Sequence, residues 1–173
     1  MEGASFSLIV KDVHNGETVF AYDTLRQLTP ASVMKTVTTA TALEILGEDY
    51  RFPTTLAYDG SIEKGLLKGN LYIKGSGDPS LGSAHFAPYH KRFLQEWISA
   101  LKKVGIHKIQ GAVIADESIF DTEGTSFKWV GEDMGSYYGA GSYGLCVFDN
   151  LYKLGLQTGA PGSRPKLKGT EPE

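Results

Sequence analysis

Long apolar runs, cysteine pairs and clustered basic charge are all missing from this sequence of 173 residues. Cys146 is the sole cysteine, which excludes a disulfide framework within the chain and a zinc site built from cysteines. The formal net charge is −3 and the basic residues are dispersed, so the sequence does not predict nucleic-acid binding. No stretch has the length of a membrane span, and no charged and apolar leader opens the chain.

Metal-ligand spacing is missing as well. The four histidines are scattered, and His85 and His90 have no carboxylate partner at a spacing that suits a metal ion. We therefore predict neither a metal site nor a cofactor. Hydrophobic residues make up 41% of the chain and charged residues 21%, which is ordinary for a globular protein and leaves room for one domain or parts of two.

The pattern of apolar residues predicts an α+β chain. Asn15-Gly16 between two alternating segments is a strong signal for a β-hairpin. Further along, short strands separated by glycine-containing turns alternate with helices, and a long loop rich in glycine, serine and aromatic residues follows. We expect strands at 6–13, 17–22, 56–58, 66–67, 70–74, 109–115 and 147–156, helices at 33–46 and 91–104, the loop at 121–144, and an exposed end or linker at 159–173.

The most informative motif is Ser32-Val33-Met34-Lys35, at the start of the first helix. Pro30 suits the first helical turn, and Gly47 suits the C-cap. Residues three apart share one helical face, so the Ser32 hydroxyl is expected within reach of the Lys35 amine. The threonine-rich run that follows has poor helix propensity, so the helix should need burial. Burial at the positive end of the helix would favour a neutral Lys35 that can accept the Ser32 proton.

The tetrad by itself has an alternative interpretation. Ser32 is equally typical of a first-turn serine that caps the helix, with Lys35 extending into solvent. Three more Ser-x-x-Lys matches occur in the chain, and each lacks the combination of proline, helix and apolar continuation. They are 61–64 beside a turn signal, 99–102 on the polar side of a helix, and 163–166 with a proline inside.

The wider context of the tetrad resembles one protein family. From Asn15 to Gly47 the sequence is similar to the start of the class C low-molecular-mass penicillin-binding proteins, of the penicillin-binding protein 4 type. These are D-alanyl-D-alanine carboxypeptidases and endopeptidases of bacterial cell walls. The similarity continues in order over residues 6–155, in the blocks 49–52, 65–72, 75–81, 109–111, 116–120 and 129–140.

This resemblance implies a domain organisation. In the family, a β-lactamase-like transpeptidase domain is interrupted just after the serine helix by inserted domains. Residues 1–50 would then be a corner of the transpeptidase domain, residues 51–156 an inserted small α/β domain, and residues 157–173 a linker or the start of the remainder. The resemblance also implies a compartment outside the cytoplasmic membrane, where peptidoglycan lies.

The resemblance further implies an acyl-transfer reaction on peptidoglycan stem peptides. Lys35 would deprotonate Ser32, which attacks the carbonyl between two terminal D-alanines and forms an acyl-enzyme. β-Lactams, which imitate that terminus, would acylate Ser32 with slow release. Asp133 and Tyr138 match an Asp and an aromatic residue five positions later that, in related enzymes, contribute to a pocket for the diaminopimelyl side chain of the stem peptide. A carboxylate there could pair with the free amine of that side chain. Without the family, they read as a turn aspartate and a tyrosine that covers the core.

Two motifs of the family have no counterpart in the chain. Phe148-Asp149-Asn150 lacks the serine of the Ser-x-Asn motif, and Lys168-Gly169-Thr170 has the residues of the Lys-Thr-Gly strand in another order. The proton relay, the carboxylate site and the second oxyanion donor would therefore be missing, and one lost donor alone costs roughly a hundredfold or more in rate. We expect an inactive fragment of an active parent.

Two other functions stay open at this point. A non-catalytic module would hold peptidoglycan without being acylated, and a serine β-lactamase would add a fast deacylation step. The insertion after the serine helix disfavours the β-lactamase. Mass spectrometry after incubation with penicillin separates all three, because only the carboxypeptidase should keep a stable adduct.

Overall fold

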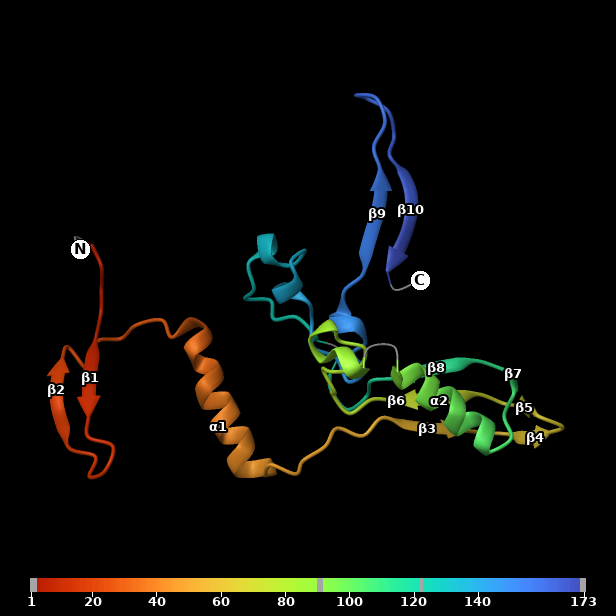
Figure 1. The fold of residues 1–173 in the computed structure, drawn as a ribbon, viewed down its shortest axis with the longest axis horizontal. Helices are drawn as coiled ribbons and strands as arrows, with labels where there is room; N and C mark the ends of the chain where they lie inside the picture. The colour runs from red at the N-terminus through yellow and green to blue at the C-terminus, as the bar shows by residue number, and fades with distance from the viewer. Residues whose placement is uncertain (1–2, 90–91, 122, 172–173) are drawn as a thin grey trace. The chain divides into compact units, whose positions relative to one another are not determined.

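The computed structural model describes residues 3–89, 92–121 and 123–171. These form two compact units, Met1–Tyr50 (unit 1) and Arg51–Glu173 (unit 2), and each is described by itself (Figure 1). Each unit combines strands with one α-helix, so the mixed α and β class predicted from the sequence is confirmed. The division after Tyr50 coincides with the expected start of the insertion; that unit 2 is an insertion stays a prediction.

Unit 1 opens with the predicted hairpin. Strands β1 (Leu8–Lys11) and β2 (Thr18–Tyr22) pair antiparallel around the Asn15-Gly16 turn. Gly16 has φ of 76°, a conformation that suits glycine, and the Asn15 side-chain oxygen accepts a hydrogen bond from the Glu17 N–H at 2.8 Å. The hairpin is therefore specified by its own turn chemistry.

The serine helix follows. A single 3₁₀ turn, η1 (Ala31–Val33), leads into α1 (Met34–Leu46). Gly47 ends the helix with φ of 80°, and its N–H donates to the Leu43 carbonyl at 3.0 Å. The predicted helix is confirmed with its C-cap, although its first turn is tighter than an α-helix.

Unit 2 is built on a three-stranded ribbon. Its first two segments, residues 55–63 and 66–74, run antiparallel in one continuous register. Tyr58 lies opposite Leu71, and Ser61 lies opposite Lys68. A third segment runs parallel to the second and also keeps one register, with Leu66 opposite Lys108 and Leu71 opposite Val113. The strands are β3 (Thr55–Tyr58), β4 (Ser61–Glu63), β5 (Leu66–Lys68), β6 (Leu71–Lys74), β7 (Lys108–Gln110) and β8 (Val113–Asp116).

A bend crosses all three segments of the ribbon at one level. Gly60, Gly69 and Gly111 lie at this bend, where the backbones approach so closely that a Cβ on any of them would collide with a neighbouring carbonyl. Asp59-Gly60, a turn signal in the sequence, is therefore part of the bend, and the tight turn falls at Lys64-Gly65. The same bend divides the single expected strand 109–115 into β7 and β8.

Asp59 holds the bend together. Its carboxylate accepts hydrogen bonds from the Asn70 N–H at 2.6 Å, the Asn70 amide at 3.1 Å and the Tyr72 hydroxyl at 2.8 Å. The Asn70 amide oxygen in turn accepts from the Ala112 N–H at 2.9 Å, which connects the third segment. The backbone bond from Asn70, followed by the bond from Tyr72, lowers the pKa of Asp59.

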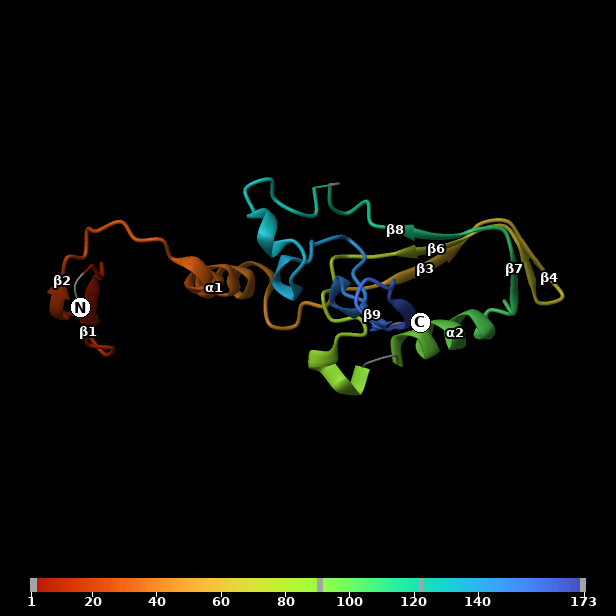
Figure 2. The same ribbon diagram turned by 90° about the horizontal axis from the view of Figure 1, so that it is seen from above.

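The core of unit 2 lies between the ribbon and one helix. Leu67, Leu71 and Ile106 form its buried cluster, and Leu101 of α2 (Arg92–Lys103) packs against it. Figures 1 and 2 together show α2 along one face of the ribbon. The helix thus packs on the core through part of its apolar stripe, at Leu101, whereas Leu94, Ile98 and Val104 of that stripe remain exposed.

The remainder of unit 2 is mostly irregular. Short 3₁₀ turns interrupt the segments between the longer elements, and the long loop 121–144 expected from the sequence is confirmed in the residues that the structure describes. These turns are η2 (Ala84–Tyr89), η3 (Gly131–Asp133), η4 (Tyr137–Gly139) and η5 (Phe148–Asn150).

The end of the chain corrects one expectation. Strand β10 (Lys166–Glu171) lies where the sequence favoured an exposed end or linker. It pairs antiparallel with β9 (Lys153–Gln157), which occupies the second half of the strand expected at 147–156, whereas η5 takes up part of the first half. The glycines and proline that suggested a linker lie mainly in the connection, and the strand pairing tolerates an irregularity between Leu167 and Gly169. Whether this hairpin begins a further domain stays a prediction.

Candidate active site

The first pair of site residues lies at the start of the serine helix. Ser32 belongs to η1 and Lys35 to the first turn of α1, so the helical path brings both side chains to one face. The Lys35 ammonium donates to Ser32 Oγ at 3.1 Å. This distance allows direct proton transfer between the two groups once the amine is neutral.

The backbone before Ser32 has a feature that the sequence did not predict. Ala31 has φ of 45°, in the left-handed region that residues with a Cβ seldom adopt. The Met34 N–H closes the turn by donating to the carbonyls of Ala31 and Ser32. The nucleophile candidate therefore follows directly on a strained residue, a common arrangement at functional sites.

The expected burial of Lys35 is wrong for this chain. Every described residue of α1 is exposed except Ala42, which is half-buried, and Ile45 keeps 74% of its surface accessible. Within the described residues of unit 1, no other element covers the helix, so this unit by itself does not provide the desolvation expected at Lys35. Burial by tertiary contacts cannot be read from the helix sequence.

The second pair lies in the long loop of unit 2. Asp133 ends η3 and Tyr138 lies in η4, and the Tyr138 hydroxyl donates to Asp133 Oδ1 at 3.0 Å. Asp133 is half-buried, whereas Tyr138 is exposed and packs edge-on against Tyr137. The structure thus joins the two residues that the sequence analysis selected together.

Close backbone packing maintains this pair. Gly139 is buried against the Asp133 carbonyl, where a Cβ would collide with the backbone. The Ser136 N–H donates to the Asp133 carbonyl at 2.9 Å, and the Gly139 N–H donates to the Ser136 carbonyl at 2.9 Å. The loop between the two site residues is therefore a compact double turn.

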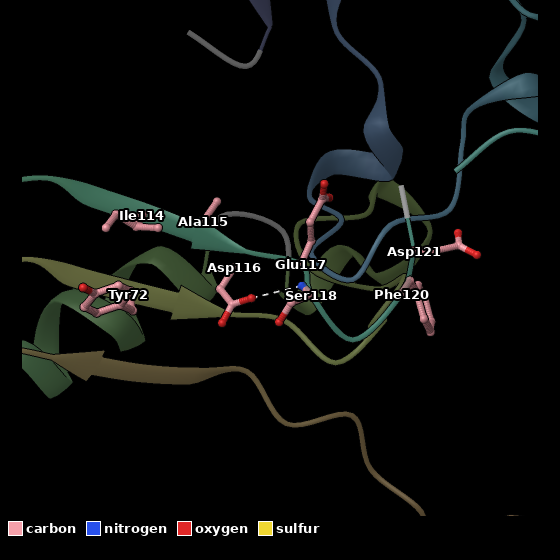
Figure 3. A pocket seen from close by; sticks show the side chains of 8 residues that line it. All are labelled: Tyr72, Ile114, Ala115, Asp116, Glu117, Ser118, Phe120 and Asp121. Atoms are coloured by element: carbon pink, nitrogen blue, oxygen red, sulfur yellow. Dashed lines mark hydrogen bonds between the residues drawn. The ribbon is translucent and has the colours of Figure 1, made fainter. Parts of the chain in front are cut away.

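A pocket of about 360 Å³ lies where β6 and β8 end (Figure 3). Three carboxylates line it: Asp116 at the end of β8, and Glu117 and Asp121 on the chain beyond the strand. Figure 3 shows the side chains of Asp116, Glu117 and Asp121 pointing in different directions. Asp116 is satisfied locally, because hydrogen bonds from Ser118 lower its pKa. We assign no catalytic role to this pocket.

Comparison with known proteins identifies the family. The profile of the D-Ala-D-Ala carboxypeptidase 3 (S13) family matches residues 1–173. The chain belongs to this family. Its resemblance to penicillin-binding proteins of the carboxypeptidase type, stated from the sequence, is confirmed.

Curated relatives of this S13 chain are much longer proteins. A D-alanyl-D-alanine carboxypeptidase from Actinomadura sp. (strain R39) is 33% identical over 147 residues, which cover 85% of this chain and 26% of that protein. The D-alanyl-D-alanine carboxypeptidase DacB of Haemophilus influenzae is 29% identical over 133 residues, covering 77% and 26%. The chain thus spans about a quarter of the length of these relatives.

Solved structures of S13 relatives share the fold. Penicillin-binding protein 4 of Haemophilus influenzae matches with a TM-score of 0.75 and 28% identity, over 92% of this chain and 34% of that chain. A second structure of that protein, complexed with a β-lactam, matches with a TM-score of 0.66 and 26% identity, over 96% and 32%.

Two further observations concern the described part of the chain. None of its helices combines the length and the apolar character that crossing a bilayer requires. Within the same residues, no three histidine, cysteine or carboxylate side chains are grouped so that they could hold a metal ion.

Proposed function

We propose that the complete S13 protein is a serine-type D-alanyl-D-alanine carboxypeptidase and endopeptidase that acts on peptidoglycan stem peptides. The contact of 3.1 Å between Lys35 Nζ and Ser32 Oγ carries this proposal, because it supplies a nucleophile and its base in one helical turn. Membership of the S13 family supports the same chemistry.

The reaction begins with proton transfer from the Ser32 hydroxyl to a neutral Lys35 amine. Ser32 Oγ attacks the carbonyl carbon of the penultimate D-alanine, and the C–N bond to the terminal D-alanine breaks as its nitrogen takes up a proton. The ester left on Ser32 is then hydrolysed by water, which restores the hydroxyl. With a cross-linked peptide the same steps release a different amine, which makes the reaction an endopeptidase reaction.

Lys35 needs a drier environment for this role than the 173-residue chain provides. Helix α1 carries apolar side chains all around its circumference, as a helix buried in a domain does. We propose that the rest of a transpeptidase-like domain covers α1 in the complete protein and that unit 2 is inserted into that domain. Such covering removes water from Lys35 and favours the neutral amine.

Asp133 and Tyr138 are proposed to select the substrate. A stem peptide with a free side-chain amine carries an ammonium group, and Asp133 can accept a charge-assisted hydrogen bond from it. The Tyr138 hydroxyl occupies Asp133 Oδ1 at 3.0 Å and fixes the direction of the carboxylate. This arrangement supports a binding role and leaves the bond-breaking chemistry to Ser32 and Lys35.

β-Lactams are proposed as inhibitors that acylate Ser32. The β-lactam complex of a relative with a TM-score of 0.66 supports this ligand class. Peptidoglycan as the substrate also places the working site outside the cytoplasmic membrane. For the 173 residues alone we expect no useful turnover, because their sequence contains neither the Ser-x-Asn nor the Lys-Thr-Gly motif.

The experiment that tests the proposal is intact-protein mass spectrometry of the complete protein after incubation with benzylpenicillin. We expect one stable adduct, which peptide mapping locates on Ser32, and no adduct on Ser32→Ala. Ser99→Ala is the matched control, because Ser99 also begins a Ser-x-x-Lys tetrad, with its hydroxyl donating to the Gln95 carbonyl in α2. This variant should be acylated like the wild type.

Two results contradict the proposal. An unmodified protein after long incubation favours a non-catalytic peptidoglycan-binding module. Rapid destruction of the penicillin with only a transient adduct favours a β-lactamase.

A further inference from the structure

A left-handed turn closes the base of the loop that carries Asp133 and Tyr138. Phe148, Asp149 and Asn150, which make up η5, have φ of 53°, 58° and 51°. Each such conformation is costly for a residue with a Cβ, and three in succession are unusual. Backbone strain of this kind persists only where surrounding contacts maintain it, which makes those contacts informative.

The body of unit 2 holds the start of this turn. The Phe148 N–H donates to the Leu81 carbonyl at 2.8 Å. The Phe148 ring packs edge-on against Phe93 of α2, with ring centroids 5.7 Å apart. Phe93 is buried, so the turn begins on a fixed support.

The end of the turn holds the loop. Asn150 Nδ2 donates to the Gly141 carbonyl at 2.7 Å and lies 3.2 Å from Cys146 Sγ, a second acceptor. Asparagine is among the few residues with a side chain that tolerate the left-handed region, so it can serve this place in the turn. Gly141 lies three residues after Tyr138, and its carbonyl is thus tied to a support outside the loop.

A second tie brings the start of the long loop to the same place. The Ser142 N–H donates to the Gly124 carbonyl at 2.9 Å, which closes the segment between them. This segment contains both Asp133 and Tyr138. The amide of Asn150 is therefore a side-chain anchor of a closed loop that presents the candidate amine-binding carboxylate.

We propose that Asn150 is a positioning residue for substrate selection: it fixes Gly141, and through it the Asp133–Tyr138 pair, for a peptide substrate that carries a free amine. The proposal rests on the proposed function, in which Asp133 accepts the substrate ammonium. It assigns a role to a residue outside the reacting groups and outside the ligand contact itself.

Asn150→Asp tests the proposal in the complete protein. Aspartate keeps the shape and tolerates the left-handed conformation, but it loses both N–H donors and faces the Gly141 carbonyl with a negative charge. Asn15→Asp is the matched control, because it makes the same chemical change in the turn of the first hairpin, where Asp-Gly is as favourable as Asn-Gly. Thermal melting of all variants verifies that the fold is intact.

The readout is the preference for a free amine. It is the ratio of kcat/KM for Nα-acetyl-L-lysyl-D-alanyl-D-alanine to kcat/KM for the same peptide acetylated on both nitrogens. We expect this ratio to exceed unity by about tenfold in the wild type, as one charge-assisted contact implies. In Asn150→Asp the ratio should fall to near unity through a higher KM for the free amine, while acylation by benzylpenicillin stays within about twofold of the wild type, as one local loop contact implies.

The Asp133→Asn variant separates the inference from the function on which it rests. If Asp133→Asn leaves the preference unchanged, the proposed amine site itself is wrong, and the inference fails with it. If Asp133→Asn removes the preference and Asn150→Asp retains it, only the positioning role is overturned. Equal losses with both substrates and with penicillin in Asn150→Asp also overturn it, because they indicate general damage to the fold.

Discussion

Unit 1 and unit 2 differ in what supports them. In the described part of unit 1 only Asp12 and Ala42 are even half-buried. Unit 2 buries Leu67 completely within a cluster and adds the hydrogen-bond network of Asp59. The candidate nucleophile lies in the unit without a core of its own, and the candidate substrate contact lies in the unit that has one. The candidate chemistry and the buried core thus lie in different parts of the chain.

The difference shows that some local contacts need no tertiary support, whereas others depend on it. The Ser32–Lys35 contact follows from helical spacing and forms without any covering element. The Asp133–Tyr138 contact needs the turns, the buried Gly139 and the anchored loop. The first geometry is therefore inherent in a short sequence, whereas the second depends on many distant residues.

The largest expected effect concerns the candidate general base of unit 1. Lys35→Met in the complete protein should lower the rate of acylation by benzylpenicillin by about 10²–10⁴, because the general base is lost. Stopped-flow measurement with a fluorescent penicillin gives this rate. Lys102→Met is the control, because Lys102 ends the tetrad that begins at Ser99 on α2. Wild-type acylation in Lys35→Met would remove Lys35 from the mechanism.

The next largest expected effect concerns the stability that the core of unit 2 provides. Leu67→Ala should destabilise unit 2 by about 2–5 kcal/mol, because Leu67 is fully buried. Ile45→Ala in the same 173-residue chain should change stability by less than about 0.5 kcal/mol, because Ile45 is exposed. Urea unfolding followed by circular dichroism measures both.

The same exposed position also tests whether α1 is covered in the complete protein. There, Ile45→Ala should cost about as much as Leu67→Ala if a further domain packs on the helix. A neutral effect in the complete protein would contradict the proposed covering of α1 and the desolvation of Lys35 that depends on it.

A smaller expected effect concerns the pH dependence of the stability of unit 2. The pKa of Asp59 is lowered in the folded state, so its contribution to stability is present above the unfolded value near 3.8 and is lost as pH falls through the lower folded value. Asp59→Asn should therefore be less stable than the wild type at pH 7, and the difference should shrink below pH 4. Melting temperatures across this pH range measure it, and a difference that persists unchanged at low pH would contradict the assignment.

The smallest effect concerns the surface of unit 2. Lys68 and Glu63 form an ion pair at 2.6 Å across β4 and β5, and both side chains are largely exposed. Glu63→Gln should change the free energy of unfolding by at most about 0.5 kcal/mol, and less at high salt. Urea unfolding at low and high ionic strength provides the measurement. A cost as large as that of Leu67→Ala would mean that surface charge, and not the core, supports this unit.

The predictable parts of the fold are those with local causes. Asn15-Gly16 specified its hairpin, and Gly47 specified the end of α1, because each acts on the backbone around it. The bend at Gly60, Gly69 and Gly111 was not predicted, because it arises from three backbones that approach one another across the ribbon. Strand β10, the second strand of the last hairpin, was missed because glycine and proline in a connection are also typical of a linker.

The candidate site divides in the same way. Ser32 and Lys35 were found from spacing within one helical turn, while Asp133 and Tyr138 were selected by resemblance to a family. Asn150 gave no usable signal, since its role appears only when Gly141 and Cys146 are brought beside it. The exposure of Lys35 was mispredicted, because a threonine-rich helix indicates a need for burial without showing what provides it.

By itself the sequence determined the hairpin, the serine helix, the amphipathic helix of unit 2 and the alignment of a hydroxyl with an amine one turn apart. These depend on backbone preferences and on side-chain periods that act over a few residues. Only the tertiary structure decided where the ribbon bends, which carboxylate is held by a tyrosine, and which side chains are withdrawn from water. Those outcomes depend on contacts between residues far apart in the chain, and such contacts leave no fixed spacing in a sequence.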